Sequence, residues 1–201
     1  MGPAWAQNAQ AAAGMARFRI LVVGDSLSAE YGLKRGSGWV ALMVQRLDKE
    51  KIPAEVRNAS ISGDTTSGGR ARLAPLLQSF KPTHVVFELG ANDALRGLPV
   101  KNTEDNLREM TTAAQQAGAK VLLVGMQVPP NYGGDYSTKF AAVFTDIAKE
   151  RKVPLVPFLL KGVADVADPG KLFQADRLHP NEMAHPAMLD NVWFELRKLL
   201  K

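Results

Sequence analysis

One serine and one Asp–His pair provide the residue types that acyl transfer requires. Ser26 closes the tripeptide Gly24–Ser26, which directly follows the apolar run Ile20–Val23. A serine hydroxyl is a poor nucleophile unless a base accepts its proton and a third group orients that base. Asp176 and His179 are three residues apart, a spacing at which a turn can place the carboxylate against one ring nitrogen and leave the other free. These three residues are a candidate catalytic triad.

The other two histidines are weaker candidates for the base. His84 opens an apolar segment, where a packing or surface residue is expected. His185 precedes Pro186 and is expected to be a surface or capping residue. By itself, Asp-x-x-His is typical of an ordinary turn, and the Gly-Asp-Ser tripeptide could be a plain link between a strand and a helix. The triad residues alone therefore leave the chemistry open.

Acyl transfer also needs hydrogen-bond donors for the oxyanion. The candidates are the backbone N–H of Ser26, the backbone N–H of Gly63 and the side-chain amide of Asn92. The Gly63 N–H can be approached closely because glycine has no Cβ. Each residue also has an ordinary structural interpretation, with Gly63 in a turn, Asn92 in an Asx turn and Asp25 as a helix cap.

The chain from residue 18 onward alternates between two hydrophobic patterns. Short apolar runs rich in β-formers predict strands at Phe18–Val23, Glu55–Ala59, Thr83–Leu89, Lys120–Met126 and Val153–Phe158. Apolar residues at helical spacing predict helices at Trp39–Leu47, Thr66–Phe80, Thr103–Ala117, Ser137–Arg151 and Leu189–Leu199. For the third helix, Asn102 is the expected N-cap and Gly118 the expected end.

This alternation predicts an α/β fold, a three-layer α/β/α sandwich around a five-stranded parallel sheet. Residues 17–201 are predicted to form a single domain. Ligands of such sheets bind at the carboxyl ends of the strands. The candidate residues follow the predicted strands at those ends: Ser26 the first, Gly63 the second, Asn92 the third, and Asp176 and His179 the fifth.

The composition excludes several classes of protein. The 201 residues carry a formal charge of +5, but the Lys and Arg residues are scattered, so no nucleic-acid partner is expected. The absence of cysteine excludes disulfides, thiolate metal sites and a cysteine nucleophile. No apolar run is long enough for a membrane span, so no integral membrane segment is expected. Neither a metal nor a cofactor is expected.

Residues 1–16 are interpreted as a disordered tail or the remnant of a secretory signal. The segment Ala4-Trp5-Ala6, followed by Gln7, resembles the small-residue end of such a signal, although the charged start and the apolar middle are missing. A periplasmic or secreted location is expected, and a cytoplasmic one stays open.

In combination, four blocks of this sequence resemble the GDSL or SGNH hydrolase family. The blocks are GDSLS at 24–28, NASISGDT at 58–65, ELGAND at 88–93 and DRLHP at 176–180. They occur in the family's order, and the resemblance covers the chain from about Phe18 to the C-terminus. The second block and VPPNYG at 128–133 resemble bacterial enzymes of the periplasmic thioesterase, arylesterase and lysophospholipase type.

This resemblance implies a role for each candidate residue. Ser26 is expected to be the nucleophile, His179 the general base and Asp176 the group that orients it. Ser26, Gly63 and Asn92 are expected to form the oxyanion hole. The implied fold is a flavodoxin-like sheet with strand order 2-1-3-4-5. The implied reaction is hydrolysis of acyl esters and thioesters through an acyl-enzyme intermediate.

Two loops beside the sheet edge are expected to border the acyl group of the substrate. Their expected substrate-binding residues are Leu95, Leu98, Met126, Val128, Pro129 and Tyr132. The chain departs from the family at Glu30, since close members often have glycine four residues after the serine. Glu30 is expected either to face solvent or to narrow and charge the site.

Three alternative functions remain open. A flavodoxin-like protein could bind a nucleotide or flavin without catalysis, although Asp25 in the first loop would repel phosphate. A metal hydrolase could use Asp176, His179, Glu182 and His185, at a loose spacing. A carbohydrate acetyl esterase could have the same fold. The oligomeric state also stays open.

Overall fold

A five-stranded parallel sheet forms the centre of the fold. The computed structural model describes residues 17–128 and 133–201. The strands lie in the order β2-β1-β3-β4-β5, and every neighbouring pair is parallel. They span β1 Phe18–Gly24, β2 Ala54–Asn58, β3 His84–Glu88, β4 Lys120–Val124 and β5 Leu155–Val156. The expected strand order is therefore confirmed.

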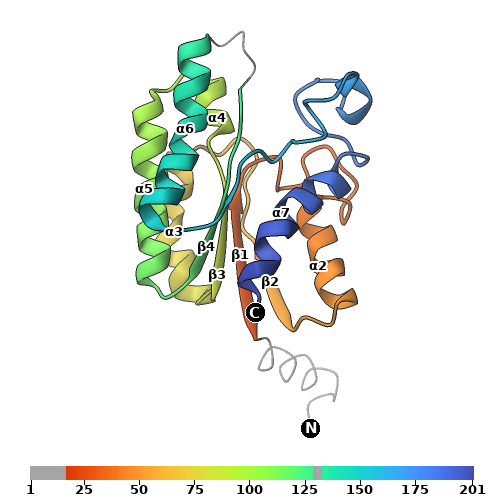
Figure 1. Ribbon diagram of the computed structural model, residues 1–201. Helices are drawn as coiled ribbons and strands as arrows, with labels where there is room; N and C mark the ends of the chain where they lie inside the picture. Colours follow the sequence, from red (N-terminus) through yellow and green to blue (C-terminus); the bar gives the residue numbers. More distant parts are fainter. Residues whose placement is uncertain (1–16, 129–132) are drawn as a thin grey trace.

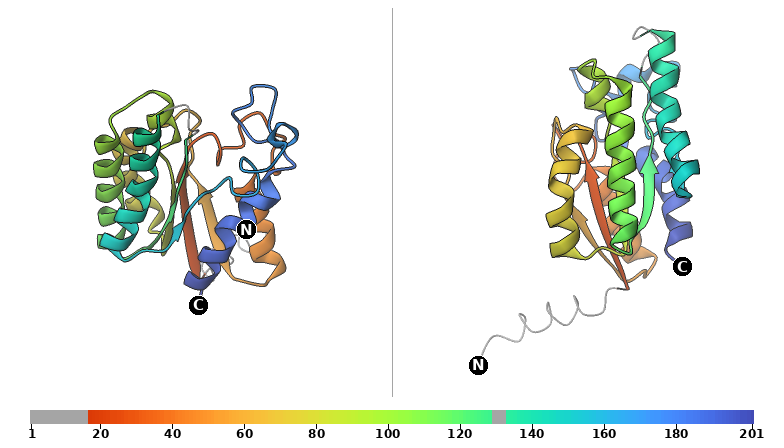
Figure 2. Two further views of the ribbon diagram at one scale, coloured as in Figure 1. Left: turned by 45° about the horizontal axis from the view of Figure 1, so that its top comes forward. Right: turned by 90° about the vertical axis from the view of Figure 1, so that its left-hand side faces the viewer.

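Helices cover both faces of this sheet and confirm the three-layer architecture. Helices α3, α5 and α6 pack side by side on one face, and α2 and α7 pack together on the other (Figures 1 and 2). The helices span α2 Trp39–Lys49, α3 Thr66–Phe80, α4 Ala91–Leu95, α5 Val100–Gln116, α6 Gly134–Arg151 and α7 His185–Leu199. A short 3₁₀ helix, η2, covers Pro169–Leu172.

The central strands are buried because both faces of the sheet are covered. Every residue of Ile20–Val23 in β1 has no exposed surface, and all five residues of β3 are buried. Apolar side chains on successive residues are what such strands require. Since all five strands run in one direction, their carboxyl ends meet at one edge, which we call the catalytic edge.

The chain ends of the described fold lie at the opposite edge. Phe18 begins β1 there, and the Leu199 carbonyl at the end of α7 contacts His84 Nε2 and Lys120 Nζ, each at 3.1 Å. His84 and Lys120 are the first residues of β3 and β4. Figure 1 shows the C-terminus at this edge, far from the loops of the catalytic edge.

The start of α5 differs from the sequence prediction. The helix begins at Val100, with Pro99 at the N-cap, so Asn102 lies inside its first turn. The Asn102 N–H already donates to the Pro99 carbonyl at 2.9 Å, so the chain turns before Asn102 is reached. The end at Gly118 is confirmed, since Gly118 follows the C-cap with a left-handed φ of 82°.

Strand β5 is shorter than predicted, and helix α4 was not predicted. Pro154 and Pro157 flank the two residues of β5, and proline cannot donate to the hydrogen bonds of a sheet. Helix α4 falls in a segment interpreted as loop, because its five residues are too few to show a helical period.

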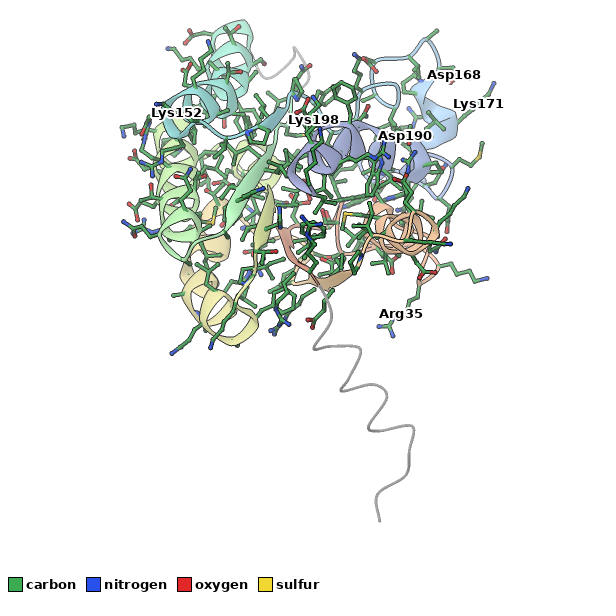
Figure 3. All side chains as sticks on the ribbon, turned by 60° about the horizontal axis from the view of Figure 1, so that its bottom comes forward. Arg35, Lys152, Asp168, Lys171, Asp190 and Lys198 are labelled. Atoms are coloured by element: carbon green, nitrogen blue, oxygen red, sulfur yellow. The ribbon has the colours of Figure 1, made fainter. Side chains whose placement is uncertain are left out.

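The charged side chains of the described surface are spread over several elements. Figure 3 labels Arg35 before α2, Lys152 after α6, Asp168 and Lys171 near η2, and two residues of α7. None of the described helices is both long and apolar enough to cross a bilayer. The interpretation of residues 1–16 falls outside the described residues.

Candidate active site

Ser26 lies in a tight turn at the catalytic edge, directly after β1. The Asp25 carbonyl accepts hydrogen bonds from the backbone N–H groups of Ser28 and Ala29, at 3.2 and 2.9 Å. The Asp25 Oδ1 accepts the Leu27 N–H at 3.0 Å, so Asp25 does cap this helical turn. The turn leaves Ser26 partly exposed between buried neighbours.

The structure brings the three predicted triad residues together. The Ser26 Oγ is 2.9 Å from His179 Nε2, and His179 Nδ1 is 2.6 Å from Asp176 Oδ2. The other carboxylate oxygen of Asp176 accepts the backbone N–H groups of Leu178 and His179 at 2.9 and 3.0 Å. Hydrogen bonds from the His179 backbone, the His179 ring and the Leu178 backbone lower the pKa of Asp176 to about 2.

The loop that carries Asp176 and His179 is tied to the nucleophile turn. The Gln174 N–H donates to the His179 carbonyl at 2.8 Å. The Gln174 Nε2 donates to the carbonyls of Tyr31 and Pro180 at 2.9 and 3.0 Å. The Tyr31 ring also lies against the His179 ring, with 4.4 Å between centroids. Sequence reasoning missed Tyr31 and Gln174, which belong to none of the quoted sequence blocks.

The three predicted oxyanion donors also lie near one another. The Asn92 Nδ2 donates to Asp25 Oδ2 at 3.1 Å and to the Asp64 carbonyl at 3.0 Å. The Asn92 amide therefore bridges the residue before Ser26 and the residue after Gly63. Both amide hydrogens of Asn92 already have acceptors, so an oxyanion would share one of them. Within the described residues, the N–H groups of Ser26 and Gly63 donate to no protein acceptor.

Gly63 is required for its backbone conformation rather than for space. Its φ is 78°, in the left-handed region that L side chains rarely adopt. A Cβ added there would approach only the Arg96 guanidinium, at an ordinary contact distance of 3.7 Å. The left-handed turn is what directs the Gly63 N–H, so the close approach assumed from sequence is the lesser reason for glycine.

A buried polar cluster around Asp93, the neighbour of Asn92, fixes the short helix that carries both residues. Asp93 is 1% exposed, and its carboxylate accepts the N–H of Thr66 at 2.9 Å and its hydroxyl at 2.5 Å. The Thr103 hydroxyl donates to the same carboxylate at 3.3 Å. These bonds join the starts of α3 and α5 to α4, the short helix that carries Asn92.

Two buried carboxyl groups lie beneath the nucleophile turn, and sequence reasoning assigned neither a role in the site. Asp25 is fully buried, and Glu88 at the end of β3 is 2% exposed. Burial raises the pKa of Asp25 to about 6. Burial, and then the nearby Asp25 carboxylate, raise the pKa of Glu88 well above its usual value. The one signal in the sequence was that Glu88 is a charged residue inside the otherwise apolar run Thr83–Leu89, because its register opposite Gly24 is known only from the structure.

The other two histidines have structural roles. His84 is 3% exposed and packs edge-on against Phe18, as expected of a packing residue. His185 is 2% exposed, so the surface interpretation is wrong. Its Nδ1 accepts the Trp39 N–H at 3.0 Å, which caps helix α2, and burial lowers the pKa of the ring.

The metal-hydrolase alternative required His185 as a ligand, but the Nδ1 of this ring is already occupied by the hydrogen bond from Trp39. Across residues 17–128 and 133–201, no three His, Asp or Glu side chains gather as a metal site requires. The metal-hydrolase alternative is therefore not favoured by the geometry of its own four residues.

Glu30 is partly exposed, and its carboxylate is directed to the start of α2, an arrangement that neither expectation included. Its φ is 60°, the left-handed conformation that suits the glycine of close family members. Its carboxylate accepts the Gly38 N–H at 2.7 Å and the Gly36 N–H at 3.0 and 3.1 Å. Gly38 is the N-cap of α2, so the negative charge lies at the positive end of that helix.

Replacing Glu30 with glycine is expected to destabilise the fold without altering catalysis. Glycine relieves about 1 kcal/mol of left-handed strain, but the variant loses bonds to a charged group that contribute about 1.5 kcal/mol or more each. With two N–H donors, Gly36 and Gly38, a net loss of about 2 kcal/mol in the free energy of unfolding follows, measured by urea titration. Glu30→Gln keeps an acceptor oxygen and should lose less. A glycine variant as stable as wild type would contradict this assignment.

The predicted substrate-binding residues differ in exposure. Leu95 is 41% exposed at the end of α4, while Leu98 and Val128 are partly buried. Met126 is 8% exposed and belongs to the hydrophobic core. Pro129 and Tyr132 lie outside the described residues. A cavity of about 420 Å³ near the Gly63 loop is lined by other residues, among them Ser60, Ile61 and Leu76.

Comparisons with known proteins agree with this arrangement. Residues 22–187 match the model of the GDSL-like lipase/acylhydrolase family. Esterase TesA of Pseudomonas aeruginosa is 50% identical over 181 residues, which cover 90% of this chain and 89% of the relative. Thioesterase 1/protease 1/lysophospholipase L1 of Escherichia coli is 40% identical over 90% of this chain and 84% of its own. A crystal structure of TesA has a TM-score of 0.86 at 49% identity, covering 90% of this chain and 99% of that one.

Proposed function

Because the chain belongs to the GDSL-like lipase/acylhydrolase family and is an ester-hydrolysing serine hydrolase, we propose that Ser26, His179 and Asp176 carry out its reaction. The observation that supports this most directly is the unbroken contact from Ser26 Oγ through the imidazole to the Asp176 carboxylate. In such an array, the imidazole can accept a proton on one nitrogen while the carboxylate holds the other.

The proposed reaction has two acyl-transfer steps. In the first, the Ser26 oxygen bonds to the acyl carbon as its proton passes to His179 Nε2. The tetrahedral intermediate then collapses, the ester or thioester bond breaks, and His179 returns the proton to the leaving alcohol or thiol. In the second step His179 accepts a proton from water, the hydroxide adds to the acyl-enzyme, and Ser26 leaves with that proton.

The oxyanion of each intermediate would be bound by the N–H groups of Ser26 and Gly63 and by the Asn92 amide. Two of these donors are unoccupied within the described residues, which favours this assignment. Preorganised donors of this kind contribute about 3–4 kcal/mol each to the stabilisation of the transition state. Asn92 would contribute through the hydrogen that it shares with the Asp64 carbonyl.

The proposed substrates are short to medium acyl esters and thioesters, including aryl esters and lysophospholipids. The names of the two relatives support esters, thioesters and lysophospholipids as substrate classes. Leu95, Leu98 and Val128 provide apolar surface near the catalytic edge for an acyl chain. A carbohydrate acetyl ester lacks such a chain, and a phosphate would meet the buried Asp25 carboxyl at the first loop, so neither alternative is favoured.

We also propose that the enzyme acts in the periplasm or outside the cell. The support is the Ala4-Trp5-Ala6 segment, which resembles the end of a secretory signal. Fractionation of the native bacterium checks this, and enzyme confined to the cytoplasm would contradict it.

A phosphonate that mimics the tetrahedral intermediate tests the proposed nucleophile. The expected result is one covalent adduct, located by mass spectrometry on the peptide that contains Ser26. Ser26→Ala should carry no adduct, while Ser62→Ala, which removes an exposed serine of a neighbouring loop, should be labelled like wild type. An adduct on any other residue would overturn the assignment.

A further inference from the structure

The Asp25 carboxylate lies between the nucleophile and the oxyanion donors. Its two oxygens have separate partners: Oδ1 accepts the Leu27 N–H at 3.0 Å, and Oδ2 accepts the Asn92 amide at 3.1 Å. The side chain is fully buried, and no Lys or Arg among the described residues pairs with it. Because a buried carboxylate without a cation is unfavourable, this position needs a reason beyond stability.

Glu88 lies directly behind Asp25. In the sheet register it stands opposite Gly24, and its Oε2 accepts the Ser28 hydroxyl at 2.6 Å and the Asp25 N–H at 3.4 Å. A Cβ on Gly24 would lie 2.8 Å from both Glu88 Oε2 and Ser28 Oγ. Glycine at position 24 is therefore what allows the Glu88 carboxyl to reach the underside of the turn.

Two carboxyl groups this close cannot both be ionised in a buried site. Asp25 accepts two N–H groups at normal length, whereas Glu88 accepts one hydroxyl and one long N–H contact. The negative charge is therefore better stabilised on Asp25, and the proton on Glu88. Two other titratable groups act on Asp25, namely His179 and Asp64, and Asp64 is itself paired with Arg72 at 2.7 Å.

We propose that Asp25 is a positioning residue of the oxyanion hole. Its carboxylate anchors one Asn92 N–H, so that the other, which also donates to the Asp64 carbonyl, is held where an oxyanion can share it. Glu88 carries the proton that leaves this carboxylate ionised. The inference rests on the proposed function, since it acts through Asn92 on the oxyanion. It gives the GDSLS block a second role, because Asp25 then links the nucleophile turn to the oxyanion donor Asn92 on α4.

Replacing Asp25 with asparagine tests the anchor. The amide oxygen can still accept the Leu27 N–H, but an NH₂ group then faces the Asn92 NH₂, and two donors repel. For a p-nitrophenyl ester, kcat is expected to fall about 10²-fold, with KM changed less than about threefold. A variant with wild-type kcat would overturn the proposal.

Two further variants separate positioning from a general structural effect. Glu88→Gln has the shape and donor of a protonated Glu88, so its kcat should stay within about threefold of wild type. The double variant Asp25→Asn with Asn92→Ala should have nearly the same kcat as Asn92→Ala alone, because both changes remove the same interaction. Losses that multiply independently in the double variant would overturn the proposal.

Infrared spectroscopy of the wild-type enzyme remains decisive if Asp25→Asn does not fold. At pH 7 a protonated-carboxyl band is expected that Glu88→Gln lacks, and the absence of that band would contradict the proton assignment. The variant Ser26→Ala distinguishes failure of the proposed function from failure of the proposed role of Asp25. An active Ser26→Ala would overturn the proposed function, whereas an inactive one beside a fully active Asp25→Asn overturns only the role of Asp25.

Discussion

Replacement of Ser26 by alanine is expected to lower kcat for p-nitrophenyl esters by about 10⁵- to 10⁶-fold, the range typical of a lost serine nucleophile. The Ser26 hydroxyl makes one described hydrogen bond, to the partly buried His179 ring. Without the hydroxyl no acyl-enzyme can form, and the remaining donors can only assist attack by water. Steady-state hydrolysis with purified variant and wild type measures the loss.

The fold should survive this substitution, which makes the result interpretable. The turn is held by the Asp25 carbonyl and carboxylate, which accept backbone N–H groups that alanine at position 26 leaves in place. The thermal midpoint should therefore stay within about 2 °C of wild type. A folded Ser26→Ala enzyme that retains substantial activity would exclude Ser26 as the nucleophile.

The second large effect is expected for Asp176→Asn, at about 10³-fold in kcat. The two carboxylate oxygens have separate tasks: Oδ1 holds the loop backbone, and Oδ2 accepts from the His179 ring. Asparagine keeps the first task, but its NH₂ donates to Nδ1 and so moves the ring proton to Nε2. That nitrogen can then no longer accept the Ser26 proton. The loss is smaller than the ~10⁴-fold of a buried triad, because the Asp176 side chain is 42% exposed.

Asp176→Ala is the matched control, since it removes both tasks together. The alanine variant should lose thermal stability along with activity, while the asparagine variant should keep the stability of wild type. Because the pKa of Asp176 is about 2, the carboxylate is ionised throughout any ordinary assay range. Equal stability and full activity in Asp176→Asn would contradict the role of the ring tautomer.

The triad could be predicted from sequence because its signals are local. Ser26 stands at a strand end, and Asp176 and His179 share one short loop, so the resemblance assigned each residue without knowledge of packing. The architecture followed equally well from the alternation of apolar runs. The strand order came from the family resemblance, because periodicity does not state which strands are neighbours.

Contacts between distant segments could not be predicted in the same way. Glu88 reaches the nucleophile turn only because β3 pairs with β1 in a register that places it opposite Gly24. His185 caps α2 through Trp39, 146 residues away in the chain. The Glu30 carboxylate reaches the N–H groups of Gly36 and Gly38 because its backbone is left-handed. A glutamate in a sequence does not predict that conformation.

The placement of the chain ends has a practical consequence for handling this enzyme. Phe18 and Leu199 lie at the edge of the sheet opposite the catalytic edge, and Figure 1 marks the C-terminus at this edge. A purification tag, fusion partner or solid support joined through the C-terminal end would face away from incoming substrate. Immobilised enzyme should therefore hydrolyse bulky esters as readily as enzyme in free solution.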